Sequence, residues 1–301
     1  MDRTQRCMLV ALATLTLASL SAQARDIWTE NFDEAKAQAA KDGKDLLLEF
    51  TGSDWCPYCI ELRQKVFDTA DFKKEAPKAF VLVEIDFPNE KKQPDSQRKR
   101  NAQLDETYGV GGRYPTMILT DAKGEPYAQV GYRQIPEEIT PKLIDLHNRK
   151  THRDELLAKA GKASGIEKAK LLDEVIRTKS SDELMPKYDD ILDQIVAADS
   201  ENKAGLKAKY ETRVELRPIF AMAEQGDIPG AIGKLEEKLK EKNATALRRQ
   251  EILYMKAILL QYNNQGPASL ASLKEARDLD PESDRGKEIA GILAQINTAQ
   301  K

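Results

Sequence analysis

The stretch "FTGSDWCPYCIELRQKVF", residues 50–67, decides the fold because it sets a close cysteine pair between an apolar run and a helical segment. The chain has three cysteines, and Cys56 and Cys59 are the two that stand close together. The apolar run "DLLLEF", residues 45–50, predicts a buried strand. A helix that begins at Cys56 would present unpaired N–H groups and the positive end of its dipole to the first sulfur, which favours a thiolate.

The tetrapeptide Cys56-Pro57-Tyr58-Cys59 has the order that a redox pair needs. Proline is favoured at the first helical position, because an N–H there would have no intrahelical partner. We therefore expect Cys56 to be the exposed thiol that attacks, and Cys59, one turn further on, to be the shielded thiol that resolves a mixed disulfide. Trp55 is expected to shield the pair and contact substrate, with an ordinary core position as its alternative. Tyr58 is expected to be exposed and to be a second contact residue.

Two structural uses of the cysteine pair compete with redox chemistry. His147 and His152 have the spacing of half a zinc site, but the stretch between them and the cysteines is far longer than in a zinc finger. A permanent disulfide across four residues would remove little entropy from the unfolded chain, so it would stabilise the fold weakly. The redox interpretation is preferred, and we expect neither a metal nor another cofactor.

Glu49 lies inside the apolar run of residues 45–50. Burial of a carboxylate is unfavourable unless it is paired or used, and it raises the pKa of that group. A glutamate in a buried central strand is therefore expected to be either used in the chemistry of the site or paired with a cation. The alternative is a structural glutamate that pairs with a lysine or points outward at the edge of the sheet.

The N-terminus has the three parts of a secretory signal. Two arginines precede a 14-residue apolar run from Cys7 to Leu20, and "SAQA" ends at Ala24 with the small residues of a cleavage site. The apolar run is shorter than the roughly 20 residues that span a bilayer. We predict a signal peptide at residues 1–24, a periplasmic or secreted mature protein, and no stable membrane insertion after cleavage. An uncleaved membrane anchor is the alternative.

The charge balance argues against nucleic acid as a partner. The formal net charge is −3, and removal of residues 1–24 leaves 45 basic and 49 acidic side chains. Such a chain has no general basic field for phosphates. The basic run "KKQPDSQRKR", residues 91–100, is broken by Pro94 and Asp95 and is typical of a solvated loop that leads into a helix.

The chain changes character near residue 150. Residues 25–150 alternate between helical segments and apolar strand segments, which predicts a sheet with helices on both faces. The strands are expected at "DLLLEF", "AFVLVEIDF", "TMILTD" and "YAQVGY", and the helices at 31–44, after Cys56, near 96–107 and at 136–150. Residues 151–301 show helical periodicity throughout and are predicted to form an all-α domain.

The first half resembles the thioredoxin superfamily, which implies a central mixed sheet flanked by helices. The likeness rests on "WCPYC" after "LLLEF", on "GGRYPT" at 111–116 and on "DAKGE" at 121–125. The longer context is similar to exported relatives of the C-terminal domain of the bacterial transmembrane disulfide electron conductor. The resemblance implies that Pro115 is cis and lies against the cysteines, and that Tyr114 offers backbone groups to an extended substrate. It also implies that Glu49 matches a buried thioredoxin aspartate and, like that residue, is a catalytic residue that helps to move the proton of Cys59.

The function expected from this resemblance is reduction or isomerisation of disulfides in client proteins. Tyr58 brings no cation between the cysteines and Glu49 disfavours a nearby thiolate, so electrons should flow outward to clients, with a membrane thiol conductor as the electron donor. Residues 219–281 weakly resemble tetratricopeptide helix pairs, which implies a docking surface for clients or partners. A helical spacer or dimerisation domain remains open. So does a helical interaction scaffold that uses the thioredoxin-like domain only for binding.

Overall fold

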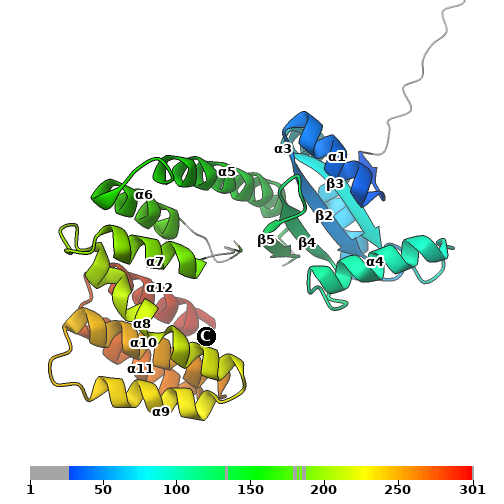
Figure 1. The fold of residues 1–301 in the computed structure, drawn as a ribbon. Helices are drawn as coiled ribbons and strands as arrows, with labels where there is room; N and C mark the ends of the chain where they lie inside the picture. Colours follow the sequence, from blue (N-terminus) through cyan, green and yellow to red (C-terminus); the bar gives the residue numbers. More distant parts are fainter. Residues whose placement is uncertain (1–26, 133–134, 179–181, 183, 185–187, 300–301) are drawn as a thin grey trace, which may run out of the picture.

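A computed structural model describes residues 27–132, 135–178, 182, 184 and 188–299 (Figure 1). A sheet with its helices forms one end of the molecule, a stack of helices forms the other, and a long helix runs from the first to the second. The expected signal peptide, residues 1–24, lies outside the described residues. Among the residues that are described, no helix has both the length and the apolar character that crossing a membrane requires.

The sheet has five strands in the order β1-β3-β2-β4-β5. They are β1 Trp28–Thr29, β2 Asp45–Thr51, β3 Phe80–Asp86, β4 Thr116–Thr120 and β5 Pro126–Gly131. The central strand β2 pairs in parallel with β3 and antiparallel with β4, so the predicted mixed sheet is confirmed. All four predicted strands are present. Strand β1 was not predicted, because two residues are too few to show an alternating pattern.

Helices cover both faces of the sheet. They are α1 Phe32–Asp42, α2 Pro57–Leu62, α3 Ala70–Ala79, α4 Asp95–Thr107 and α5 Pro136–Ala160, with one π-helical turn, η1 Arg63–Phe67, directly after α2. Leu47 packs into a core shared with α2, η1, α3 and α5. Its neighbours Leu46 and Leu48 pack into the opposite core, shared with α1 and the end of α4. Strand β2 is therefore buried on both faces, as its continuous apolar run predicts.

Helices α1 and α3 each begin at a residue whose side chain accepts a hydrogen bond from a backbone N–H of the first turn. Asn31 accepts the N–H of Glu34 at the start of α1, and Thr69 accepts the N–H of Phe72 at the start of α3. Helix α1 ends at Gly43, whose φ of 66° lies in the left-handed region that glycine adopts without steric strain. These local signals set where the helices lie against the sheet.

The described residues of the second half form helices joined by turns, with no strand among them. They are α6 Gly165–Arg177, α7 Tyr188–Ala198, α8 Leu206–Glu224, α9 Ile228–Leu239, α10 Ala246–Tyr262, α11 Gly266–Leu279 and α12 Asp284–Ala299. Each helix contacts the next along the chain. One apolar core is formed by the end of α5 together with α6, α7 and α8. A second apolar core is formed by all five helices from α8 through α12. The resulting stack of helices follows the half that contains the sheet, which confirms the all-α prediction.

Helix α5 runs without interruption through the predicted domain boundary at residue 150. Its first part places Leu143 and Leu146 in the core of the sheet, and its last part places Leu156 and Ala160 in the core of the helical half. The two halves thus share one 25-residue helix. The boundary itself stays a prediction.

Phe72 offers a test of the apolar core against which α2, the helix that begins after Cys56, packs. Its ring is fully buried, 4.7 Å from the ring of Phe67 and 6.0 Å from that of Trp28. Phe72→Ala should lower the free energy of unfolding by about 3–5 kcal/mol, because the cavity left in this core cannot collapse fully. Both tryptophans of the chain lie in this half, so tryptophan fluorescence during urea unfolding measures the change there.

The control is Tyr262→Ala, which removes a ring that is 73% exposed. This substitution should change the same free energy by less than about 0.5 kcal/mol. An equal effect of the two substitutions would contradict the assigned core.

Candidate active site

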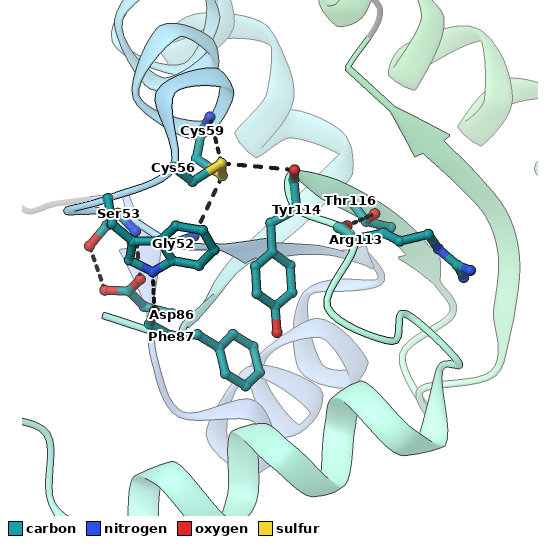
Figure 2. The surroundings of a disulfide bond; sticks show 10 residues. Gly52, Ser53, Cys56, Cys59, Asp86, Phe87, Arg113, Tyr114 and Thr116 are labelled. Atoms are coloured by element: carbon teal, nitrogen blue, oxygen red, sulfur yellow. Dashed lines mark hydrogen bonds between the residues drawn. A yellow bond between two sulfur atoms is a disulfide. The ribbon is translucent and has the colours of Figure 1, made fainter. Parts of the chain in front are cut away.

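Cys56 and Cys59 form a disulfide at the start of α2, with their Cα atoms 5.2 Å apart (Figure 2). Cys56 is the residue that caps the helix, and its Sγ accepts the N–H of Cys59 at 3.3 Å. The Sγ of Cys59 accepts the N–H of Gly52 at 3.5 Å. Each sulfur therefore faces a backbone N–H, the group that stabilises a thiolate when the pair is reduced.

Both cysteines are nearly covered. Cys56 is 5% exposed and Cys59 is 1% exposed, so the predicted order of exposure is correct but the prediction of an exposed Cys56 is wrong. The backbone carbonyl of Tyr114 lies 3.8 Å from the Sγ of Cys56 and helps to cover it (Figure 2). Tyr114 is 58 residues away along the chain, so only the resemblance, which placed Pro115 against the cysteines, pointed to this segment.

The peptide bond between Tyr114 and Pro115 is cis, as the resemblance implied. The Tyr114 ring stacks on Phe87 at 4.9 Å, and its hydroxyl donates to Asp105 at 3.2 Å. Burial, together with the nearby charge of Asp105, raises the pKa of Tyr114. The ring is thus held from two sides, which fixes the backbone that faces Cys56.

Trp55 and Tyr58 are the exposed aromatic residues beside the disulfide, at 44% and 51%. The indole Nε1 of Trp55 donates to the carbonyl of Phe87 at 2.7 Å, and its ring lies edge-on to Tyr114 with the centroids 6.3 Å apart. Trp55 is therefore not an ordinary core residue. Its ring is fixed by a hydrogen bond while nearly half of its surface stays open to solvent.

Asp54 holds the loop after β3 against residues 52–56, the cysteine loop between β2 and α2. Its carboxylate accepts the backbone N–H groups of residues 89, 90 and 91 at 2.8–3.0 Å, and these bonds hold the pKa of Asp54 below its usual value. Ser53 adds two hydrogen bonds to Asp86, at 2.9 Å and 2.6 Å. Neither Asp54 nor Asp86 was predicted to be part of the site. An aspartate next to Trp55 in a loop was the available signal, since such carboxylates commonly accept loop N–H groups.

Glu49 is fully buried in β2, on the central strand and not at an edge of the sheet. Its Oε2 lies 2.8 Å from a guanidinium nitrogen of Arg63, so its partner is an arginine and not the lysine that the structural alternative proposed. Its Oε1 is buried and has no hydrogen-bond partner among the described residues. Burial raises the pKa of Glu49 to about 8, although Arg63 lowers it. The carboxyl group therefore exchanges its proton near neutral pH.

The two histidines are not brought to the cysteines. His147 Nδ1 lies 2.8 Å from Asp45, at the start of β2, whereas the cysteine loop follows the end of that strand at Thr51. His152 Nε2 lies 3.6 Å from Glu174 in the helical half. No cluster of three metal-binding side chains occurs in the part of the chain that the structure describes.

Comparison with known proteins agrees with this geometry. A family profile described as a thioredoxin-like domain matches residues 32–147. "Disulfide bond reductase DsbH" of Chlamydia pneumoniae is 32% identical over 143 residues, which are 42% of this chain and 86% of that protein. The chain belongs to the thioredoxin-like family. It is a thiol–disulfide oxidoreductase, and the Cys56–Cys59 pair has the spacing that this chemistry uses.

Two further comparisons cover similar shares of this chain. "Thioredoxin-related protein DsbJ" of Chlamydia pneumoniae is 29% identical over 139 residues, which cover 42% of this chain and 40% of that protein. A solved structure titled "DsbH Oxidoreductase" is 29% identical and covers 49% of this chain and 94% of that chain, with a TM-score of 0.38.

Gly52 provides a test of the aromatic site. A Cβ added there would lie 2.5 Å from the indole ring of Trp55, so Gly52→Ala should displace the ring and break its hydrogen bond to Phe87. We expect a change in tryptophan emission and a loss of stability of about 1–3 kcal/mol, as for other overpacked sites. Turnover in an insulin-reduction assay should also fall.

Gly131→Ala is the matched control, because a Cβ at Gly131 would meet nothing within 4 Å. Emission and turnover should stay those of the wild-type protein in this variant. An unchanged Trp55 emission in Gly52→Ala would contradict the described packing.

Proposed function

We propose that this protein is an exported reductase or isomerase of disulfides in client proteins, with Cys56 as the attacking thiol and Cys59 as the resolving thiol. The observation that carries the proposal is the position of the Cys56 sulfur. It caps α2, accepts the N–H of Cys59, and lies beside the Tyr114 carbonyl. The signal-like sequence of residues 1–24 supports export to a periplasm or an extracellular space.

The reaction begins with the reduced Cys56–Cys59 pair. The Cys56 thiolate attacks one sulfur of a client disulfide, so that a mixed disulfide forms and one client thiolate leaves. Cys59 gives up its proton, with Glu49 as the acceptor, and its thiolate attacks the Sγ of Cys56. The second client thiol is released and the Cys56–Cys59 disulfide forms. Two electrons have passed from the protein to the client.

Client binding is assigned to Trp55, Tyr58, Tyr114 and Pro115. The two exposed aromatic rings offer apolar contact next to the sulfurs. The Tyr114 backbone, fixed by its ring contacts and followed by the cis Pro115, offers hydrogen bonds to an extended client segment. A covered Cys56 fits this mode, since a segment laid along Tyr114 would reach the sulfur directly.

The reductive direction is supported by the residues around the pair. Tyr58 places no cation between the cysteines, and a carboxylate at Glu49 disfavours a thiolate nearby, so the disulfide form of the pair is relatively stable. One relative carries the name of a disulfide bond reductase. A reductase in an oxidising compartment must be recharged, and a membrane thiol conductor is the proposed electron donor.

The helical half is proposed to dock clients or partners. A cavity of about 960 Å³ lies among α6, α7, α8, α10 and α12. Five basic and three acidic side chains line it, namely Arg177, Lys209, Arg213, Arg285 and Lys287 with Glu251, Asp284 and Glu288. The excess of positive charge contrasts with the net charge of −3 of the whole chain. Acidic client segments suit this cavity by charge complementarity.

Trapping of clients tests the roles of the two thiols. Cys59→Ser should accumulate mixed disulfides, because Cys56 still attacks but nothing releases the client. Cys56→Ser should trap none. Non-reducing gels of the full-length variants, with and without added dithiol, measure the adducts. Adducts in the Cys56 variant alone would reverse the assignment.

An insulin-reduction assay on the wild-type protein and the two serine variants distinguishes an enzyme from a binding scaffold. Wild-type protein should reduce insulin disulfides in a dithiol-dependent reaction, and both serine variants should lose this turnover. Absence of turnover in the wild-type protein would favour a helical scaffold that only binds.

Charge reversal in the helical cavity tests docking. The side chains of Arg177 and Lys287 are each 64% exposed. Each forms one long ion pair, Arg177 with Asp173 at 4.0 Å and Lys287 with Glu282 at 3.4 Å. Replacing both by glutamate should therefore preserve the fold. We expect the kcat/KM for an acidic disulfide protein such as α-lactalbumin to fall roughly three- to tenfold, because each exposed charge pair contributes up to about 1 kcal/mol. Turnover of a short neutral disulfide peptide should not change.

The matched control is the reversal of Lys242 and Lys274, two exposed lysines of the helical half that do not line the cavity. It makes the same change in net charge. An equal loss in this control would assign the effect to overall charge and leave the docking proposal without support.

A further inference from the structure

Three ionisable side chains meet at the end of α2, the helix that begins after Cys56. Glu49 of β2 and Glu84 of β3 stand directly opposite each other on neighbouring parallel strands. One guanidinium nitrogen of Arg63 lies 2.8 Å from Glu49 and 2.9 Å from Glu84, so a single cation bridges two carboxylates. Arg63 also touches the active site, because its backbone N–H donates to the carbonyls of Cys59 and Ile60.

The surroundings hold Arg63 in this position. Its guanidinium lies over the ring of Trp28 at 4.8 Å and near the ring of Phe67 at 5.5 Å. Arg63 is also the first residue of the π-helical turn, an irregularity that occurs frequently at functional sites. The side chain is 25% exposed, that of Glu84 is 19% exposed and that of Glu49 is fully buried. The carboxyl of Glu49 therefore depends on its two neighbours, because no water shell screens it.

We infer that Arg63 and Glu84 are a pair of positioning residues that set, in opposite directions, the pH at which Glu49 exchanges its proton. The link to catalysis rests on the proposed function of Glu49 as the acceptor of the Cys59 proton. Neither Arg63 nor Glu84 is assigned a contact with substrate.

The direction of each effect follows from charge. The Arg63 cation favours the Glu49 carboxylate and lowers its pKa, whereas the Glu84 anion opposes a second negative charge and raises it. Of the other groups that face Glu49, Asp86 raises the pKa and the Thr51 side chain lowers it. Burial is the largest influence and raises the pKa. The balance leaves the pKa at about 8, within reach of the pH at which thiols lose their protons.

The proposed roles of Arg63 and Glu84 predict that removing each charge shifts the titration of the Glu49 carboxyl in opposite directions. Arg63→Gln should move the titration of the Glu49 carboxyl upward by about 1–3 pH units, the range that a neighbouring opposite charge produces. Glu84→Gln should move it downward, and Arg63→Lys, which keeps the charge, should restore most of the wild-type position. The difference in carboxyl infrared absorption between each variant and the same variant with Glu49→Gln, measured on reduced full-length protein, isolates the Glu49 signal.

Turnover of insulin disulfides as a function of pH gives the second readout. Its midpoint should follow the carboxyl titration in each variant. Lys65→Gln is the matched control, because Lys65 lies in the same π-helical turn, is 58% exposed and pairs with Glu61. This variant should leave both midpoints in place. A merely structural loss of stability would not move the midpoints of Arg63→Gln and Glu84→Gln in opposite directions.

The outcomes separate the inference from the function on which it rests. Shifts of the Glu49 titration in the same direction in both variants, or no shift in either, would overturn the inference. Glu84→Gln preserves shape, so this test holds even when Arg63→Gln fails to fold. If the titration moves as expected but Glu49→Gln leaves the pH profile of turnover unchanged, Arg63 and Glu84 remain positioning residues for Glu49. The proposed role of Glu49 as proton acceptor then fails.

Discussion

The enclosure of β2 is the constraint on which the rest of this structure depends. All seven residues of Asp45–Thr51 are buried, with hydrogen-bonded strands on both edges and an apolar core on each face. The chain can leave this strand only at the end of the sheet, and there Gly52 donates its N–H to Cys59. The same enclosure removes Glu49 from water. The position of the cysteine loop and the raised pKa of the Glu49 carboxyl therefore have one cause.

Local patterns made much of the fold predictable. The four long strands follow from apolar runs, the start of α2 follows from Pro57, and the division into a mixed sheet and a helical half follows from a change of periodicity. Strand β1 and the π-helical turn at Arg63–Phe67 escaped prediction for physical reasons. Two residues carry no period, and a single i→i+5 turn changes the hydrogen bonding of the backbone without a distinct sequence pattern.

From the residues alone the site was predictable only as far as its chemistry is local, and the family resemblance added Tyr114 and the cis Pro115. The cysteine pair and the burial of Glu49 are visible in the sequence, but the partner of Glu49 is not. A single guanidinium nitrogen of Arg63 contacts both carboxylates, which come from neighbouring strands. That contact depends on the register Glu49↔Glu84, which no run of residues reveals. The coverage of Cys56 by the Tyr114 carbonyl is equally non-local.

The helical half is tied to the sheet by more than the shared helix α5. On the edge strand β5, Gln129 donates its N–H to Asp182 at 3.0 Å, and Tyr127 accepts the N–H of Leu184 at 2.7 Å. These residues, which follow α6, satisfy backbone groups that an edge strand would otherwise leave open to another chain. A client held by the helical half would therefore be attached to the same body as Cys56. Its disulfide would meet the thiol in an intramolecular step, at an effective concentration set by this attachment and not by the concentration of free client.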